Sequence, residues 1–186
     1  MTYLELYNAL NYVDHSRTKR REMSNLILNA PTHIAPLMEI AFQVDDPVSC
    51  KACWVLEFTA KEHLGYLFPS IDTFVHNIGS VHLDPAVRPI AKICEILMKS
   101  YFQLKDQETL DALNDEHLES ITSACFDWLI GDHKVAAQAY SMTSLLLLGR
   151  KFDWIHPELR MILEQNYQNG SAAYKARARM TLAKLR

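Results

Sequence analysis

The sequence predicts an all-α protein, and three observations lead to that fold class. It contains only five glycines and seven prolines in 186 residues, whereas Leu, Ala, Glu and Lys, which favour helices, are frequent and Val is sparse. Similar segments recur with a period of roughly 40 residues, and apolar residues recur within them at helical spacing. The length is that of one domain, so we expect residues 1–186 to form a single domain.

The repeat aligns on the turns that precede four similar helices. The aligned residues are Asp46, Asp84, Asp132 and Gly170, at steps of 38, 48 and 38 residues. A turn followed by a helix rich in small residues, at this period, is typical of stacked helical hairpins. The additional residues of the middle step fall in the polar segment 103–114, which we predict to be a long loop with room for a short helical turn.

The predicted helices form pairs along the chain. Five hairpins are expected, over residues 2–29, 33–63, 66–102, 115–149 and 155–185. Prolines stand near the beginning of the first helix in three hairpins, where a missing N–H costs little: Pro36, Pro69 and Pro157. The second helices are preceded by side chains that can accept hydrogen bonds from the first turn: Asp46, Asp84, Asp132 and Ser171.

Three second helices carry a stripe of apolar or small residues at positions i, i+4, i+7 and i+11, which predicts their buried faces. The stripes are Ser49/Cys53/Leu56/Ala60, Val87/Ala91/Cys94/Met98 and Val135/Ala139/Met142/Leu146. In the last helix the matching residues are Ala173, Arg177, Met180 and Lys184. Because two of these are charged, we expect this face to have no neighbour, as in the terminal cap of a repeat protein.

The segment "DPAVRPIAKICEIL" from Asp84 resembles the second helix of a HEAT repeat, in which a turn acid and a proline precede Val-Arg and then small residues at helical spacing. Val87, Arg88 and Ala91 match this pattern, and Val135 and Ala139 match it in part. The resemblance implies a HEAT/armadillo-like, right-handed α–α superhelix of about five hairpins. The second helices would line its concave surface.

The whole chain is also similar to a group of short bacterial proteins that bear the name adenylosuccinate lyase. True enzymes of that name carry a Ser-Ser-x-Met-Pro-x-Lys-x-Asn loop. The segment Tyr140–Lys151, "YSMTSLLLLGRK", shares only isolated Ser and Met residues with that loop. The residues therefore do not support a lyase activity.

Charged and aromatic residues lie beside the buried stripes. Arg88, Lys92 and Glu95 share one face of their helix, because they are spaced at i, i+4 and i+7. With the equivalent positions of neighbouring repeats, the candidate binding residues are Trp54, Glu57, Arg88, Lys92, Glu95 and Tyr140. Aromatic and arginine side chains carry much of the energy of protein interfaces. Alternatively, Arg88 bonds turn carbonyls or Asp84, while Lys92 and Glu95 pair with each other.

No motif for catalysis or cofactor binding is present. The sequence lacks a His-Glu-x-x-His zinc motif, a glycine-rich phosphate loop and a Gly-x-Ser-x-Gly nucleophile turn. Cys50 and Cys53 form a single Cys-x-x-Cys pair in the small-residue part of a helix, so we interpret them as buried thiols. We therefore predict no catalytic residue, no bound metal and no cofactor.

The formal net charge is −3, but both ends of the chain are basic and the middle is acidic. The basic ends are "SRTKRR" at residues 16–21 and "YKARARMTLAKLR" at residues 174–186. We interpret these bases as solvated faces of terminal caps. Their convergence on one surface would instead favour a nucleic-acid-binding module similar to the HEAT-like DNA alkylation repair proteins.

The sequence thus predicts a non-catalytic interaction or scaffold module that binds a protein or peptide on its concave face. A nucleic-acid-binding module is the first alternative and a metabolic enzyme the second. The amino terminus lacks the charged-then-apolar pattern of a signal peptide, and the apolar run Leu145–Leu148 is far shorter than the ~20 residues of a membrane span. We expect a cytoplasmic protein with no membrane partner.

Overall fold

The structure, a computed structural model, describes residues 1–185. Within these residues it contains helices and turns and no β-strand, which confirms the all-α prediction. The α-helices are α1 (Tyr3–Leu10), α2 (Arg17–Asn29), α3 (Ile34–Ala41), α4 (Pro47–Glu62), α5 (Ile71–Asn77), α6 (Asp84–Lys99), α7 (Gln107–Ala112), α8 (Asp115–Ile130), α9 (Val135–Leu148), α10 (Ile155–Tyr167) and α11 (Ala172–Leu182). Short 3-10 segments precede α3 and α5 and follow α5.

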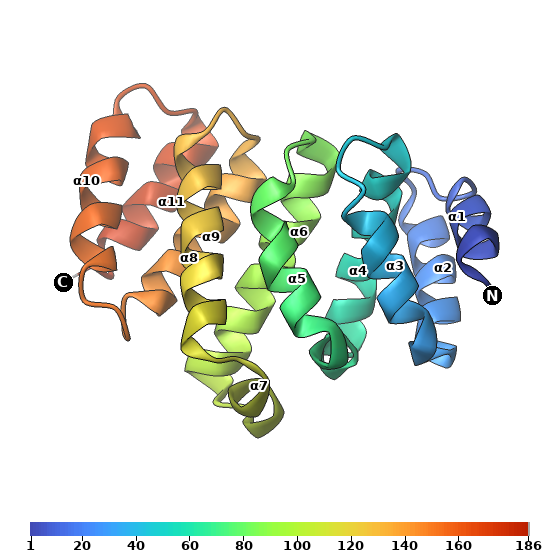
Figure 1. Cartoon of the computed structure of the whole chain (residues 1–186). Helices are drawn as coiled ribbons and strands as arrows, with labels where there is room; N and C mark the ends of the chain where they lie inside the picture. The colour runs from blue at the N-terminus through green and yellow to red at the C-terminus, as the bar shows by residue number, and fades with distance from the viewer. Residues whose placement is uncertain (186) are drawn as a thin grey trace.

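The helices lie in two layers that run along the molecule (Figure 1). In the second layer α2 contacts α4, α4 contacts α6, α6 contacts α9 and α9 contacts α11. The first layer contains α1, α3, α5, α8 and α10, which lie in front of these helices in Figure 1. Contacts between layers join helices that follow each other in the chain, such as α3 with α4, α8 with α9, and α10 with α11.

Two predicted caps of the second-layer helices are confirmed. Asp46 accepts a hydrogen bond from the backbone N–H of Val48 at 2.9 Å, and Ser171 accepts one from the N–H of Tyr174 at 3.2 Å. Both side chains satisfy N–H groups that the first turn of a helix leaves without a partner.

The other two predicted caps are wrong. Asp84 is the first residue of α6 and not its cap. Its carboxylate lies 3.4 Å from Nδ1 of His133 instead, in the turn between α8 and α9. Asp132 does not cap α9 either, because the chain enters that helix from Lys134, whose side chain makes no capping bond. A tertiary contact has thus replaced the local one at Asp84.

The apolar stripes predict the buried faces of α4 and α6 correctly, since all eight stripe residues of these helices are buried. The prediction for α9 is wrong in part. Met142 is buried, but Val135, Ala139 and Leu146 are only partly buried. The cause is that α6, α8, α10 and α11 all contact α9, so residues on several of its sides are buried and no single stripe marks the core.

The predicted long loop at 103–114 contains the helix α7. The end of α6 widens into a π-helical turn over Ser100–Leu104, and Lys105 then adopts a left-handed conformation with φ 54°. Asp106 accepts a hydrogen bond from the N–H of Thr109 at 3.0 Å and so begins α7. The segment between α6 and α8 is therefore a folded connection.

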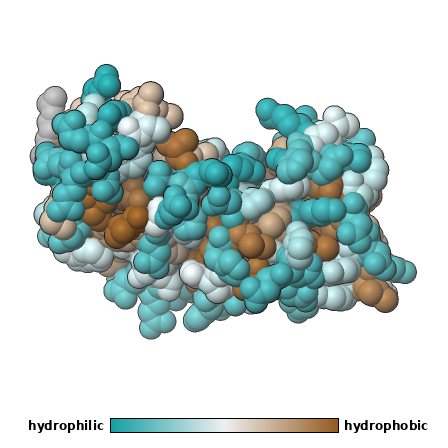
Figure 2. Space-filling model, turned by 90° about the horizontal axis from the view of Figure 1, so that it is seen from above, coloured by the Kyte–Doolittle hydropathy of each residue, from teal (hydrophilic) through white to brown (hydrophobic). Residues whose placement is uncertain are grey.

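The side of the molecule on which the second layer lies is hollowed. Seen from above, the outline is indented on its upper side in Figure 2. Because α4, α6 and α9 lie behind the first layer in Figure 1, they form this side. None of the helices within residues 1–185 is long and apolar enough to cross a membrane.

Candidate binding face on the second helix layer

Trp54 is buried at the N-terminal end of the hollowed side, with 7% of its surface exposed. Its Nε1 donates a hydrogen bond to the carbonyl oxygen of Pro85 at 2.7 Å, which ties α4 to the beginning of α6. The guanidinium of Arg20 lies 4.3 Å from the indole centroid, and the ring of His15 lies 5.1 Å away. A partner that approaches this region therefore meets Arg20 and His15 before the indole.

Glu57 is a buried carboxylate, 1% exposed, on α4. Arg88 on α6 donates to both of its oxygens, at 2.8 and 3.3 Å. Such a two-pronged pair is stronger and more directional than a single hydrogen bond. Lys61, one turn along α4, supplies a second cation to the same carboxylate. Two partly exposed bases thus surround one buried acid.

Glu95 on α6 repeats this arrangement. Its carboxylate is buried and pairs with Lys92 on one oxygen and with Lys99, at 2.9 Å, on the other. The ammonium of Lys92 also lies 4.7 Å from the centroid of the Tyr140 ring on α9, within the range of a cation–π interaction. The local pairing of Lys92 with Glu95 is therefore present, whereas Arg88 pairs with Glu57 and not with Asp84.

The charge of Glu95 makes stability depend on pH. Burial raises the pKa of Glu95, but hydrogen bonds from Lys92 and Lys99 lower it further, so the net pKa lies below the usual 4.5. A carboxyl whose pKa is lowered by folding stabilises the protein above its unfolded pKa, and this contribution is lost as pH falls through the folded pKa.

We expect Glu95→Gln to be less stable than the wild type at pH 7, with a difference that narrows steadily below about pH 4.5. Urea unfolding of both proteins across this range measures the difference. Glu164→Gln is the control, because Glu164 is exposed on α10 and should give a nearly pH-independent difference. A stability gap for Glu95→Gln that stays constant down to low pH would contradict the assignment.

Four basic residues bridge the junctions between neighbouring second-layer helices, in addition to Arg21 on α2, which pairs with Glu62 on α4 at 3.8 Å. We call these four the bridging bases: Arg20 (α2 to α4), Arg88 (α6 to α4), Lys92 (α6 to α9) and Arg177 (α11 to α9). Burial and then the charge of Arg88 lower the pKa of Arg20. The sequence interpretation singled out Arg88 and Lys92 but not Arg20 or Arg177.

Arg177 corrects the prediction for the last helix. Its Nη2 donates to Oγ1 of Thr143 at 2.7 Å and to the carbonyl oxygen of Ala139 at 3.3 Å. The side chain therefore reaches back to α9, although the other three residues of the predicted stripe, Ala173, Met180 and Lys184, are exposed. The repeat alignment could have predicted this contact, because Arg177 aligns with Ala91 and Ala139. Both lie on helices that pack directly against their neighbours in the layer.

Charge is segregated between the two layers. The second-layer helices carry twelve bases against five acids. The bases are Arg17, Lys19, Arg20, Arg21, Lys51, Lys61, Arg88, Lys92, Lys99, Lys175, Arg177 and Arg179, and the acids are Glu22, Glu57, Glu62, Asp84 and Glu95. The first-layer helices carry one base, Arg160, against nine acids: Glu5, Glu39, Asp72, Asp115, Glu116, Glu119, Asp127, Glu158 and Glu164.

All four cysteines are buried and free, as predicted for structural thiols. Burial raises the pKa of Cys53 and Cys94 well above the ordinary range and that of Cys125 to about 12. Because the thiolate is the reactive form, these thiols are poor nucleophiles and poor metal ligands. The Sγ of Cys53 donates to the carbonyl oxygen of Ala41 at 3.6 Å, which is a structural contact between α3 and α4.

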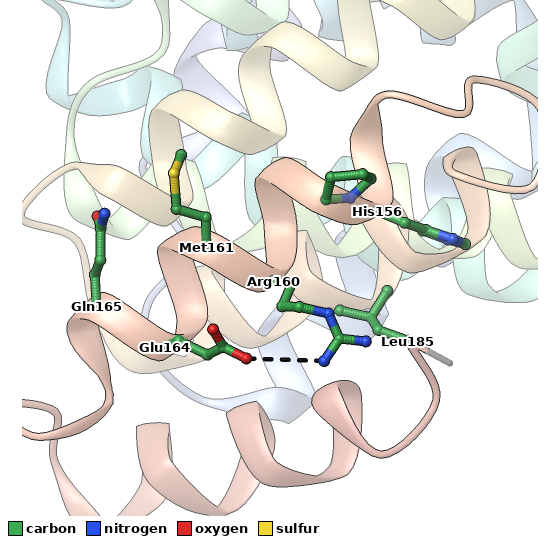
Figure 3. A pocket seen from close by; sticks show the side chains of 7 residues that line it. His156, Arg160, Met161, Glu164, Gln165 and Leu185 are labelled. Carbon is green, nitrogen blue, oxygen red and sulfur yellow. Dashed lines mark ion pairs between the residues drawn. The ribbon is translucent and has the colours of Figure 1, made fainter.

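A cavity of about 560 Å³ lies away from the candidate binding residues, along α10 and the chain after α11. Figure 3 shows that its lining comes mainly from successive turns of α10, with Arg160 facing Glu164. These two side chains form an ion pair at 3.7 Å, and Leu185 and Met161 supply apolar surface. This cavity therefore belongs to the outer side of the last helix pair.

The candidate binding residues thus lie in three groups of contacts, of which two join α4 to α6 and one joins α6 to α9. Trp54 and Tyr140 each lie beneath a base, Glu57 and Glu95 are buried acids with two bases each, and Arg88 and Lys92 are partly buried. No family model matches the chain, and neither a curated protein nor a solved structure matches it.

Proposed function

We propose that this chain is a non-catalytic interaction module whose second-layer face binds an acidic protein or peptide segment. Its helices would stack as about five hairpins in a right-handed, HEAT/armadillo-like superhelix. The unbroken order of contacts from α2 through α4, α6 and α9 to α11 supports this arrangement, and so does the hollow on the same side of the molecule (Figure 2). In such folds the curved layer is the usual binding surface.

The segregation of charge between the layers is the observation that carries the proposal. A protein with a net charge of −3 has no general attraction for anions, yet its second-layer helices hold twelve bases and five acids. Two of those acids, Glu57 and Glu95, are buried beneath pairs of bases. The charge that an approaching partner meets on this face is therefore mainly positive, and complementary charge favours an acidic partner.

The bases that lie against Trp54 and Tyr140 favour a peptide over a nucleic acid as the partner. Proteins that bind single-stranded nucleic acids stack bases on exposed aromatic rings. Trp54 is buried under Arg20, and the ring of Tyr140 has Lys92 against it. A base therefore already lies against each ring. Nucleic acid remains the second candidate, because the excess of bases over four second-layer helices is also what a phosphate backbone requires.

Fluorescence anisotropy with a labelled poly-glutamate peptide tests the proposal. We expect the wild type to bind at low ionic strength and the triple variant Arg20→Gln/Lys61→Gln/Lys99→Gln to bind about tenfold more weakly, since each partly exposed ion pair contributes up to ~1 kcal/mol. Glu57 keeps Arg88 and Glu95 keeps Lys92 in this variant, so the fold should persist.

A matched control removes the same number of charges elsewhere. Lys134, Lys151 and Arg160 lie outside the second-layer helices and are exposed, so their replacement by Gln should leave binding unchanged. An equal loss of peptide affinity in the two triple variants would show that only the net charge of the protein matters, and it would refute the proposal. Tighter binding of a duplex DNA, with a steep decrease between two salt concentrations, would favour the second candidate.

A further inference from the structure

A small cavity at the C-terminal end of the second layer is lined by bases and by no acid. It lies between α9, α11 and the π-helical turn Ser100–Leu104, and its volume is about 80 Å³. Its charged lining residues are Arg150, Arg177 and Lys184, and its neutral polar ones include Thr143 and Gln103. Arg177 and Lys184 come from α11 and the residues after it, and Arg150 from the residues after α9. Three cations so close together are unfavourable unless an anion or solvent compensates them.

The three bases have no acidic partner within residues 1–185. Arg150 donates to the carbonyl oxygen of Phe102 at 3.4 Å, and Arg177 donates through Nη2 to Thr143 and Ala139. None of the three belongs to an ion pair among the described residues. These backbone and hydroxyl contacts fix the arginines in place but leave their charges uncompensated.

Arg177 has a buried donor without an acceptor within residues 1–185. Its Nε is buried and lacks any hydrogen-bond acceptor among the described residues. Buried donors without acceptors are costly, and they are rare in folded proteins. The guanidinium is also held in one orientation by Thr143, so little further ordering would be needed for it to bind an anion.

The size of the cavity limits what can enter it. A volume of about 80 Å³ holds several water molecules, because the centre of each water needs roughly 10–15 Å³ of free space. It is well below the ~300 Å³ of a site for an extended organic ligand. The lining also includes Leu146, Leu147 and Met180. A single tetrahedral group with acceptor oxygens matches both the volume and the donors among the lining residues.

We propose that this cavity binds one phosphate group, as a free ion or as the terminal group of a phosphate monoester. Arg177 would bind its oxygens from α11, Arg150 and Lys184 would approach from the ends of α9 and α11, and Gln103 would add a neutral donor. This inference goes beyond the acidic-peptide function and does not rest on it, because it concerns one small anion in one cavity.

Phosphate titrations test the proposal directly. Inorganic phosphate should raise the unfolding temperature in a saturable way, whereas chloride at equal ionic strength should not, because a ligand that binds only the folded state stabilises it by mass action. Isothermal titration calorimetry then gives the dissociation constant. We expect Arg150→Gln/Lys184→Gln to weaken binding at least about tenfold.

The two variant positions are chosen because Arg150 and Lys184 are exposed, so their loss should leave the fold intact. Arg179→Gln is the matched control, since Arg179 lies on the same helix as Arg177 but outside the cavity, and it should bind like the wild type. Phosphoserine as a second ligand distinguishes the sources: tighter binding than inorganic phosphate indicates an ester, and weaker binding a free ion. Equal effects of phosphate and chloride, or wild-type affinity in the double variant, would overturn the proposal.

Discussion

Arg88→Met is expected to destabilise the protein by about 2–3 kcal/mol, more than the removal of its acidic partner. The reason is the asymmetry of burial, because Glu57 is 1% exposed while the Arg88 side chain is 30% exposed. Removing the base leaves a buried carboxylate with only Lys61 to compensate it, and an uncompensated buried charge is costly. Glu57→Gln leaves Arg88 and Lys61 able to turn toward water, so we expect a loss of about 1 kcal/mol or less.

Urea unfolding of the two single variants and of Arg88→Met/Glu57→Gln measures this asymmetry. The double variant should be more stable than Arg88→Met alone, since it no longer contains the buried carboxylate of Glu57. Arg160→Met serves as the control, because Arg160 belongs to an exposed pair and its replacement should change stability by no more than about 0.5 kcal/mol. A larger loss in Glu57→Gln than in Arg88→Met would show that the acid is not the constrained partner.

Gly149→Ala is expected to destabilise the protein by about 2 kcal/mol through a steric conflict. Gly149 follows α9 with φ −64°, a conformation that alanine also adopts, so backbone strain is not the cause. A methyl group there would lie 2.0 Å from Cδ2 of His156. The imidazole would have to move, and its hydrogen bond to the carbonyl oxygen of Leu146 at 3.0 Å would be lost.

The same conflict predicts a rescue. In the Gly149→Ala variant, the additional substitution His156→Ala should restore part of the lost stability, whereas in the wild type the same substitution should only destabilise the protein. Thermal unfolding of the wild type, the two single variants and the double variant gives the interaction free energy between the two positions. Gly79→Ala is the control, because a methyl group at Gly79 would meet nothing within 4 Å. Failure of the second substitution to rescue would show that the imidazole was not the obstacle.

The sequence predicts the helices well where a helix has one buried face. In α4 and α6 the stripes match burial at every position, because apolar and small residues recur with the period of the helix. In α9 the period is lost, since four other helices contact it. The cap at Asp84 failed for a different reason: His133, 49 positions away, provides a competing partner that no local pattern contains.

The sequence could predict the positions of the candidate site, but not which of them pair with each other across the helix layer. Helical spacing identified Arg88, Lys92 and Glu95 as neighbours, and the structure brings Lys92 and Glu95 together. The partners across the layer were not predictable, because Glu57 and Arg88 are 31 positions apart and Arg177 and Thr143 are 34 apart. The basic ends of the chain illustrate the same limit: Arg20 and Arg177, which resemble solvated cap residues in sequence, both pack against neighbouring helices.

The opposite charges of the two layers have a consequence for how a partner would arrive. With a net charge of −3, the molecule as a whole exerts little attraction on an anion, but two parallel layers of opposite sign form a dipole across its short dimension. The field of an approaching anion exerts a torque on such a dipole, so the protein turns its basic layer toward the anion before contact. Packed helices lie about 8–10 Å apart, comparable to the ~8 Å screening length at physiological salt. As the salt concentration rises, the orientation of the protein toward an approaching anion would therefore be lost before the binding itself is abolished.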